Sequence, residues 1–308
     1  MTTSTPDSAT PDATTPDAVA TDGRSQFEVV PVQVAEPGLA HDLRAVKIVL
    51  QRELIRFGQD RTRMISALIQ PVLFLFVLGT GLSSLTKGAT GGVDLRTFMF
   101  PGVLATSVLF TAVFSAISIV WDREFGFLRE MLVAPVSRGS IMVGKCLGGA
   151  TVAALQGCIV LALAGLVGVP YAPLMMISLL LQMFVLSFAL CALGLVIAAR
   201  IQQMQAVMGI MQMLLLPLSF LSGALYPLND LPRWLEIIVK LNPITYAVHS
   251  IRTTVFAHLD MNTKALDALN PDLTWGSFVV PQWLQITLVG LIGMGLLGIA
   301  MAQFATAE

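Results

Sequence analysis

The sequence predicts an all-α membrane protein with six transmembrane helices. Charged residues make up only 12% of the 308-residue chain, against about 25% in an ordinary soluble domain. Apolar residues reach 55%, and the mean hydropathy is +0.78. These apolar residues gather in long runs, and a bilayer core requires roughly 20 of them per helix. A water-soluble fold of this size could not cover its surface with so few charges.

Six runs are long enough to span a bilayer and contain no Asp, Glu, Lys or Arg. They are Met64–Leu85, Phe98–Trp121, Cys146–Val169, Leu174–Ala199, Ile201–Leu228 and Val279–Ala307. We expect each run to form a helix, because a helix satisfies its own backbone hydrogen bonds in lipid. The three cysteines lie in these runs without metal-ligand or redox spacing, so we interpret them as packing residues.

Residues 1–37 repeat Thr-Pro-Asp three times, at Thr5–Asp7, Thr10–Asp12 and Thr15–Asp17. This composition lacks the large apolar side chains that folding requires, so we expect a disordered tail. The first basic residue is Arg24, beyond the acidic repeat, which does not fit a signal peptide. We therefore expect the tail to be retained in the cytosol.

Residues 38–62 predict an amphipathic helix at the membrane interface, ahead of a transmembrane domain over residues 63–308. Leu43, Val46, Leu50, Leu54 and Phe57 share one helical face, and most basic residues lie elsewhere. Lys and Arg near short loops are retained on the cytoplasmic side. We therefore expect both termini in the cytosol and the protein in the plasma (inner) membrane.

The loop between spans two and three carries Arg123, Arg129, Arg138 and Lys145, and the same rule places it in the cytosol. Within it, Phe125, Leu128 and Leu132 follow helical spacing until Pro135 stops the helix. A short amphipathic helix of this kind suits a docking surface. A plain interfacial loop helix explains the same periodicity, and both interpretations stay open at this point.

The stretch between spans five and six contains the largely apolar segment Trp234–Ile251. Glu236, Lys240 and the break at Asn242-Pro243 interrupt it, so it is unsuited to crossing the bilayer. We expect a re-entrant or interfacial pair of helices.

Two segments resemble signatures of the ABC-2 family of export permeases, particularly the daunorubicin-resistance type of drug exporter. They are FPGVLATSVLFTAVFSAISIVWDREFGFLREMLVAPVSRGSIMVGK at Phe100–Lys145 and LSGALYPLNDLPRWLEIIVKLNPITYAV at Leu221–Val248. The resemblance extends from about Leu39 to the C-terminus. It implies the fold of that family: six spans, a cytosolic coupling helix between spans two and three, and re-entrant helices between spans five and six.

The resemblance also implies roles for particular residues. The contacts to a cytosolic ATPase subunit would be Arg123, Glu124, Phe125, Leu128, Arg129, Pro135 and Arg138. The structural elements of an outer gate would be Leu221, Tyr226, Pro227, Trp234, Asn242 and Pro243. ATP and magnesium would be bound by the ATPase partner, and this chain would bind no cofactor or metal of its own.

Two polar stripes are candidates for a translocation path. Span two carries Ser107, Thr111, Ser115 and Ser118 at helical spacing, and span five carries Gln205, Gln212 and Ser219. Hydroxyls in membrane helices also bond to their own backbone or pack against neighbouring helices, and this alternative carries greater weight here.

The segment GSIMVGKC at Gly139–Cys146 begins like a phosphate-binding loop, but Cys146 replaces the Ser or Thr that holds magnesium. No buried strand precedes it, so we interpret it as part of a spanning helix. Gly144 and Gly148 form a small-xxx-small pair, and the last span carries Gly290, Gly293, Gly295 and Gly298. Close helix packing accounts for these glycines without a ligand.

The sequence therefore favours an exporter subunit that moves a hydrophobic or amphipathic compound, such as a drug, an antibiotic or a lipid. No ionisable residue lies in the middle of a run, which disfavours an ion-driven secondary transporter. No constellation of acid, base or metal ligands suggests an enzyme. The expected partners are an ABC-type ATPase, a second permease copy or homologue, and membrane lipids; a net charge of −1 gives no indication of nucleic acid.

Two other functions stay open. An ABC-2 permease for a lipid-linked glycan or another cell-envelope component would share the same fold. A protein of another class, either a secondary transporter or a membrane interaction protein without transport activity, is the remaining alternative.

Overall fold

The computed structural model describes residues 38–81, 94–127, 136–226, 228, 231–259 and 269–306, all within the unit Ala35–Glu308. This part of the chain is mostly helical. Five of its helical segments are long and apolar enough to cross a membrane, namely Met64–Gly81, Leu95–Glu124, Arg138–Leu161, Pro173–Arg200 and Gln282–Thr306. The chain is a multi-pass membrane protein.

Helix α1 (Leu39–Gln59) occupies the segment in which an amphipathic helix is predicted. Asp60 ends it, and a second helical run follows at once as α2 (Arg61–Val72), a π-helical stretch η1 (Leu73–Leu78) and α3 (Gly79–Gly81). The predicted first span, Met64–Leu85, coincides with this second helical run as far as Gly81, the last residue described there.

The second span is bent. Its longer part is α5 (Leu95–Ser115), and a turn at Ala116 and Ile117 separates it from the short α6 (Ser118–Glu124). Asp94 caps the start, since its side chain accepts a hydrogen bond from the backbone N–H of Arg96 at 3.1 Å.

The third span begins earlier than expected. Helix α8 runs over Arg138–Leu161 and is followed by a 3-10 turn, η2 (Ala164–Val167). The predicted start at Cys146 is wrong, because that boundary assumed that Lys145 stays in water. Lys145 instead lies two turns inside the helix with its charge paired to carboxylates of other helices.

Helices α9 (Pro173–Arg200) and α14 (Gln282–Thr306) match the predicted fourth and sixth runs. Helix α10 (Met204–Phe220) lies within the predicted fifth run, Ile201–Leu228, but ends before that run does and contains only 17 residues. At 1.5 Å per residue it is about 26 Å long, slightly less than the roughly 30 Å of a bilayer core.

Between α10 and α14 lie α11 (Arg233–Leu241), α12 (Pro243–Phe256) and a small hairpin of β1 (Thr274–Trp275) and β2 (Phe278–Val279). The predicted pair of helices with a break at Asn242-Pro243 is confirmed. Gly276, with φ of 63°, makes the turn of the hairpin, since only glycine adopts this conformation without strain.

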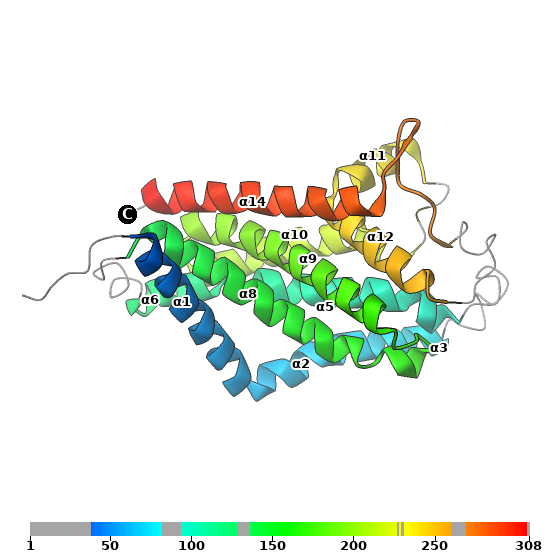
Figure 1. Cartoon of the computed structure of the whole chain (residues 1–308), viewed down its shortest axis with the longest axis horizontal. Helices are drawn as coiled ribbons and strands as arrows, with labels where there is room; N and C mark the ends of the chain where they lie inside the picture. Colours follow the sequence, from blue (N-terminus) through cyan, green and yellow to red (C-terminus); the bar gives the residue numbers. More distant parts are fainter. Residues whose placement is uncertain are drawn as a thin grey trace, which may run out of the picture. The chain divides into compact units, whose positions relative to one another are not determined.

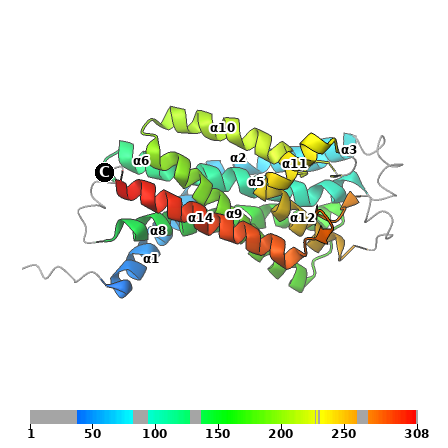
Figure 2. The ribbon, with the colours of Figure 1, turned by 90° about the horizontal axis from the view of Figure 1, so that it is seen from above.

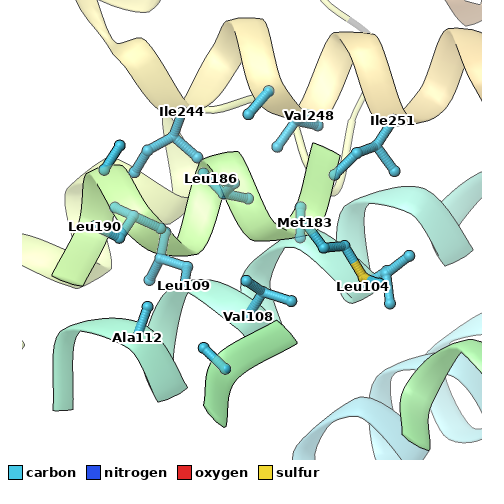
Figure 3. Close-up of a cluster of buried hydrophobic side chains, with 14 of the residues drawn as sticks. Leu104, Val108, Leu109, Ala112, Met183, Leu186, Leu190, Ile244, Val248 and Ile251 are labelled. Carbon is cyan, nitrogen blue, oxygen red and sulfur yellow. The ribbon is translucent and has the colours of Figure 1, made fainter. Parts of the chain in front are cut away.

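Helix α9 packs against α14, α8 and α5, as Figures 1 and 2 show. Figure 3 shows part of the core, where Met183 and Leu186 of α9 lie between Val248 and Ile251 of α12 on one side and Leu104 and Val108 of α5 on the other. Helix α10 buries only the narrow stripe Val207, Met211, Leu215 and Ser219. Met204 and Leu218 pack partly against the core, while Met208, Ile210, Met213, Leu214, Leu216 and Phe220 are exposed.

Figure 1 places α6, the start of α8 and the end of α14 together at one end of the helices. We call this the α6 end. Helices α11 and α12 and the hairpin lie toward the opposite end, which we call the α11 end. The candidate site residues divide between these two ends.

Candidate functional site

A buried ionic cluster joins three helices at the α6 end. The ammonium Nζ of Lys145 (α8) lies 2.8 Å from Oε1 of Glu53 (α1), forms an ion pair with Asp122 (α6) and donates to the hydroxyl of Ser118 at 3.0 Å. The side chain of Lys145 is 1% exposed. Arg52 also pairs with Asp122. Two cations therefore meet two carboxylates, which is how buried charges are accommodated.

Glycines on α8 make this cluster possible. A Cβ atom at Gly144 would lie 2.8 Å from Cβ of Val49, and one at Gly148 would lie 3.0 Å from Cβ of Glu53. Backbone of α8 thus lies directly against α1, which brings Glu53 within reach of Lys145. The predicted close packing at this glycine pair is confirmed.

The glycines of α14 behave differently from one another. A Cβ at Gly293 would lie 2.8 Å from Cα of Ala189, and one at Gly290 would make an ordinary 3.6 Å contact with Val185. Gly295 and Gly298 have nothing within 4 Å. Close packing inside this chain is therefore the wrong explanation for these last two glycines.

Three of the predicted ATPase contacts lie on or just after α6. The guanidinium of Arg123 donates to backbone carbonyls at the end of α9, at 3.2 Å to Ala199 and 3.3 Å to Ile201. This bond satisfies carbonyls that a helix end otherwise leaves without donors. Glu124 and Phe125 are exposed, and Phe125 has 64% of its surface accessible.

Of the other four predicted ATPase contacts, the structure describes only Arg138. Leu128, Arg129 and Pro135 lie outside the described residues. Arg138 begins α8 and donates to the carbonyl of Ala305 near the end of α14 at 3.4 Å. The coupling role of the whole set stays a prediction.

An amphipathic cavity of about 290 Å³ opens beside the ionic cluster, between α1, the α5–α6 bend, α8 and α10. It is lined by Glu53, Arg56, Phe57, Asp60, Phe114, Ser115, Ile117, Ser118, Trp121, Val152 and Met208. The guanidinium of Arg56 lies 5.3 Å from the centre of the Trp121 ring. Ser115 and Ser118, predicted as path residues, thus contribute to one cavity at the α6 end.

The other predicted path residues do not join this cavity. The hydroxyls of Ser107 and Thr111 donate to the carbonyls of Leu104 and Ser107, at 2.8 and 3.0 Å, as the backbone-bonding alternative predicts. Ser219 likewise bonds to the carbonyl of Leu216. Gln205 and Gln212 are exposed on α10.

At the α11 end, side chains of the α11–α12 region hold the end of α10. Asn242 donates to the carbonyl of Leu218 at 2.9 Å and accepts from the N–H of Ile244 at 3.0 Å, which caps α12. Pro243 occupies the first turn of α12, where its missing N–H costs nothing. Thr245 donates to Leu221 at 3.4 Å.

The other predicted gate residues are less engaged. Tyr226 and Leu221 are half-buried, and Trp234 is 64% exposed. Pro227 lies outside the described residues. The gate function of the set stays a prediction, while Asn242 has a defined structural role.

Arg252 on α12 is a residue that the sequence interpretation missed. It is 2% exposed, donates to the carbonyls of Gly223 at 2.7 Å and Ala224 at 3.3 Å, and lies 4.8 Å from the centre of the Phe98 ring. Burial lowers the pKa of Arg252 to about 10, so the group keeps its charge at neutral pH. An arginine within an otherwise apolar helical run was the available signal.

A polar network surrounds the same part of α12. Gln182 of α9 donates to the hydroxyl of Thr254 at 2.7 Å, and Gln282 of α14 donates to it at 2.6 Å. His249 lies 3.0 Å from both Oε1 of Gln285 and the carbonyl of Pro271. His249 lies within α12 and is 6% exposed, so these polar neighbours surround a buried ring.

The chain offers no phosphate-binding loop at Gly139–Cys146, since these residues form the first turns of α8 and Lys145 is bound to carboxylates. Within the described residues, no group of three or more His, Cys, Asp or Glu could hold a metal ion.

Comparisons with known proteins agree with this architecture. The chain is 28% identical over 214 residues to a putative transport permease, ycf38, of Cyanophora paradoxa, covering 67% of this chain and 72% of that protein. It is 28% identical to nodulation protein J of Rhizobium leguminosarum bv. trifolii, covering 63% and 74%.

It is also 26% identical over 236 residues to a probable doxorubicin resistance ABC transporter permease protein, DrrC, of Mycobacterium tuberculosis, covering 75% of this chain and 85% of that protein. The sequence profile of the ABC-2 type transporter matches residues 44–256, which is more than half of the chain and includes α12 with Arg252. The chain belongs to the ABC-2 type transporter family.

Proposed function

We propose that this chain is the membrane subunit of an ATP-driven exporter that moves a hydrophobic or amphipathic compound out of the cell. The observation that carries the proposal is the layout of the α6 end. There Trp121 lines the amphipathic cavity, and its ring centre lies 5.7 Å from that of the exposed Phe125, so a cargo site and a docking surface would lie on one bent span. ATP and magnesium would be bound and used by a separate ATPase subunit.

The proposed membrane arrangement has six spans, with α10 as the fifth and the α11–α12 pair as a re-entrant unit. The α6 end would face the cytosol, because Arg123, Arg138 and Arg200 lie there and basic residues favour that side. Both termini would be cytosolic in the inner membrane. Residues 1–37 would form the free tail, residues 38–62 the interfacial helix and residues 63–308 the transmembrane domain.

The proposed mechanism uses two permease copies above two ATPase subunits. Closure of the ATPases would push the segment Glu124–Val133, and α6 would transmit the push to α5 across the bend at Ala116 and Ile117. The ionic cluster would carry the same movement into α1 and α8. The exposed apolar face of α10, with Met213 and Phe220, suits contact with the second copy.

The lining of the cavity supports an amphipathic cargo over a glycan chain. Phe57, Phe114 and Trp121 provide aromatic surfaces, and Glu53 and Asp60 provide carboxylates. A polymer of sugars would require a wider, mainly polar lining. Export of a lipid-linked glycan therefore stays the second choice.

The test is capture of the ATPase together with transport in sealed vesicles. Glu124→Arg and Phe125→Asp should each abolish ATPase capture and ATP-dependent cargo uptake into inverted vesicles, while membrane insertion is unchanged. Leu241→Asp is the matched control, because Leu241 is 83% exposed but belongs to the α11 end.

Unchanged capture in both α6 variants would refute the docking role. Uptake driven by an ion gradient without ATP would favour a secondary transporter. Normal capture with no uptake of any tested compound would favour an interaction protein without transport activity.

A further inference from the structure

The buried histidine of α12 joins three segments of the chain at the α11 end. Nδ1 of His249 lies 3.0 Å from Oε1 of Gln285, in the first turn of α14. Its Nε2 lies 3.0 Å from the carbonyl oxygen of Pro271, which precedes β1. The proposed export function assigns no role to this ring.

Both atoms that face the ring are hydrogen-bond acceptors. The carbonyl of Pro271 can only accept. The side-chain amide of Gln285 donates through Nε2 to the carbonyl of Val280 at 2.8 Å, which leaves Oε1 toward His249. Rotating the amide by half a turn would bring Oε1 against the Val280 carbonyl, and two acceptors repel. Val280 therefore sets the orientation of the amide, whatever the state of the ring.

A neutral imidazole cannot satisfy both contacts. It carries one N–H and one unprotonated nitrogen, and an unprotonated nitrogen that faces a carbonyl oxygen repels it. The imidazolium carries two N–H groups, which can donate to Gln285 and Pro271 together. The arrangement of acceptors around His249 therefore fits the protonated ring.

Neighbouring groups act on the charge of this ring in opposite directions. Burial, the largest cause, and the guanidinium of Arg252 lower the pKa of His249, while the acceptors of Gln285 and Pro271 and the carboxylate of Asp272 raise it. The net direction is downward, so the ring takes up its proton below the ordinary histidine pKa of about 6.5.

Few other ionisable groups lie on the elements around α12. Helix α14 has none. The others in the described elements are Tyr246 of α12, His258 just after it, Arg96 of α5, Cys191 and Arg200 of α9, and Arg233, Glu236 and Lys240 of α11. Glu236 and Lys240 pair with each other.

We propose that His249 binds a proton from the outer solution and that the protonated ring fastens α12 to the start of α14 and to the segment before β1. When the ring is neutral, one of the two hydrogen bonds is lost. The bond to Pro271 is the one that opens, because it is only partly buried, whereas the bond to Gln285 is buried.

The proposal has a consequence for the surface of the α11 end. Pro271 and Asp272 line a cavity of about 270 Å³ beside α11, so one wall of that cavity would move with the charge of the ring. The proposal rests on the proposed membrane arrangement only for the side from which the proton comes. It does not depend on the cargo or on coupling to an ATPase.

The experiment measures hydrogen exchange of the full-length chain in lipid nanodiscs at about pH 5 and about pH 7.5, on either side of the ordinary histidine pKa. Rates are divided by those of an unfolded peptide at the same pH. Protection of residues 272–275 should be roughly tenfold greater at the lower pH, the effect of one charge-assisted hydrogen bond. His249→Gln, which cannot titrate, should abolish this difference.

The matched control is His258→Gln. His258 lies close to the end of α12 and contacts only the carbonyl of Thr254 among its printed neighbours, at 3.0 Å, so this variant should keep the pH difference. Equal protection of the wild type at both pH values would overturn the proposal. So would a pH difference that persists in His249→Gln, or one that is lost equally in both variants.

A surface variant tests the proposal without changing the ring. Asp272 is exposed, and its carboxylate favours the charged ring. Asp272→Asn should therefore move the midpoint of the pH dependence down by about 0.2–0.7 of a pH unit, the effect of one exposed charge. A midpoint equal to or above that of the wild type would overturn the assignment of the titration to His249.

Discussion

The two ends of the molecule bury positive charge in different ways. At the α6 end, Lys145 is neutralised by Glu53 and Asp122, carried by two other helices. At the α11 end, Arg252 is held by the carbonyls of Gly223 and Ala224 and by the ring of Phe98. One end pairs charge with charge, and the other pairs charge with dipoles and an aromatic face.

The difference determines what happens when one member is lost. Removing one partner from a buried ion cluster leaves a charge that is neither paired nor hydrated, and this strongly reduces the free energy of unfolding. Removing Arg252 leaves neutral carbonyls that lack donors, which costs less. The α6 end is thus the more sensitive to single substitutions, which suits a place where a partner would apply force.

The largest expected effect is from Lys145→Met. This change leaves Glu53 and Asp122 buried near each other and reduces the free energy of unfolding by about 3–5 kcal/mol. Denaturant unfolding in detergent micelles measures it. Adding Glu53→Gln and Asp122→Asn to the same chain should restore much of the loss; equal instability of the triple variant would contradict the charge argument.

Arg252→Met should have a smaller effect, because it removes donors from two carbonyls but also removes the buried charge. We expect a loss of about 2 kcal/mol in the free energy of unfolding. Hydrogen exchange should increase at residues 221–226, where the chain leaves α10. Arg252→Lys, which keeps the charge on a shorter donor, should have an intermediate stability. A stability equal to the wild type in Arg252→Met would show that the hydrogen bonds from Arg252 to Gly223 and Ala224 do not stabilise the protein.

Gly144→Ala probes the contact that brings the cluster together. The new Cβ would lie 2.8 Å from Cβ of Val49, so α1 must move, and overpacking costs about 1–3 kcal/mol. The higher helix propensity of alanine offsets about 1 kcal/mol of this. The melting temperature should therefore be lower in Gly144→Ala than in the wild type. It should be unchanged or higher in Gly298→Ala, because a Cβ atom at Gly298 would have open space. The reverse order would show that α1 is not fixed on α8.

The smallest effect concerns an exposed ion pair at the α11 end. The hydrogen bond from Lys240, at 2.6 Å, lowers the pKa of Glu236. A lowered folded-state pKa means that the pair stabilises α11 above the ordinary carboxyl pKa of about 4.3 and that this contribution is lost as the pH falls through the lowered value. NMR titration should show a higher pKa of Glu236 in Lys240→Gln; an identical titration would show that the pair does not persist in solution.

Local properties of the sequence predicted most of the helices. The length of a charge-free run predicts a span regardless of the fold, which is why α9 and α14 match their predicted runs within a few residues. The break at Asn242-Pro243 separates α11 from α12 as predicted, because proline disfavours the helical conformation of the residue before it, and Asn242 is extended with ψ of 115°. The same reasoning failed at Lys145, where a charge was treated as the end of a span.

The sequence by itself determined that the chain crosses the membrane several times and that its glycine pair on α8 suits close packing. The tertiary structure alone decided which charges are buried. Lys145 and Glu53 are 92 positions apart, and the Arg252 guanidinium reaches a carbonyl 29 positions away. The cost of burying a charge depends on its partners, and partners at such separations meet only when helices pack.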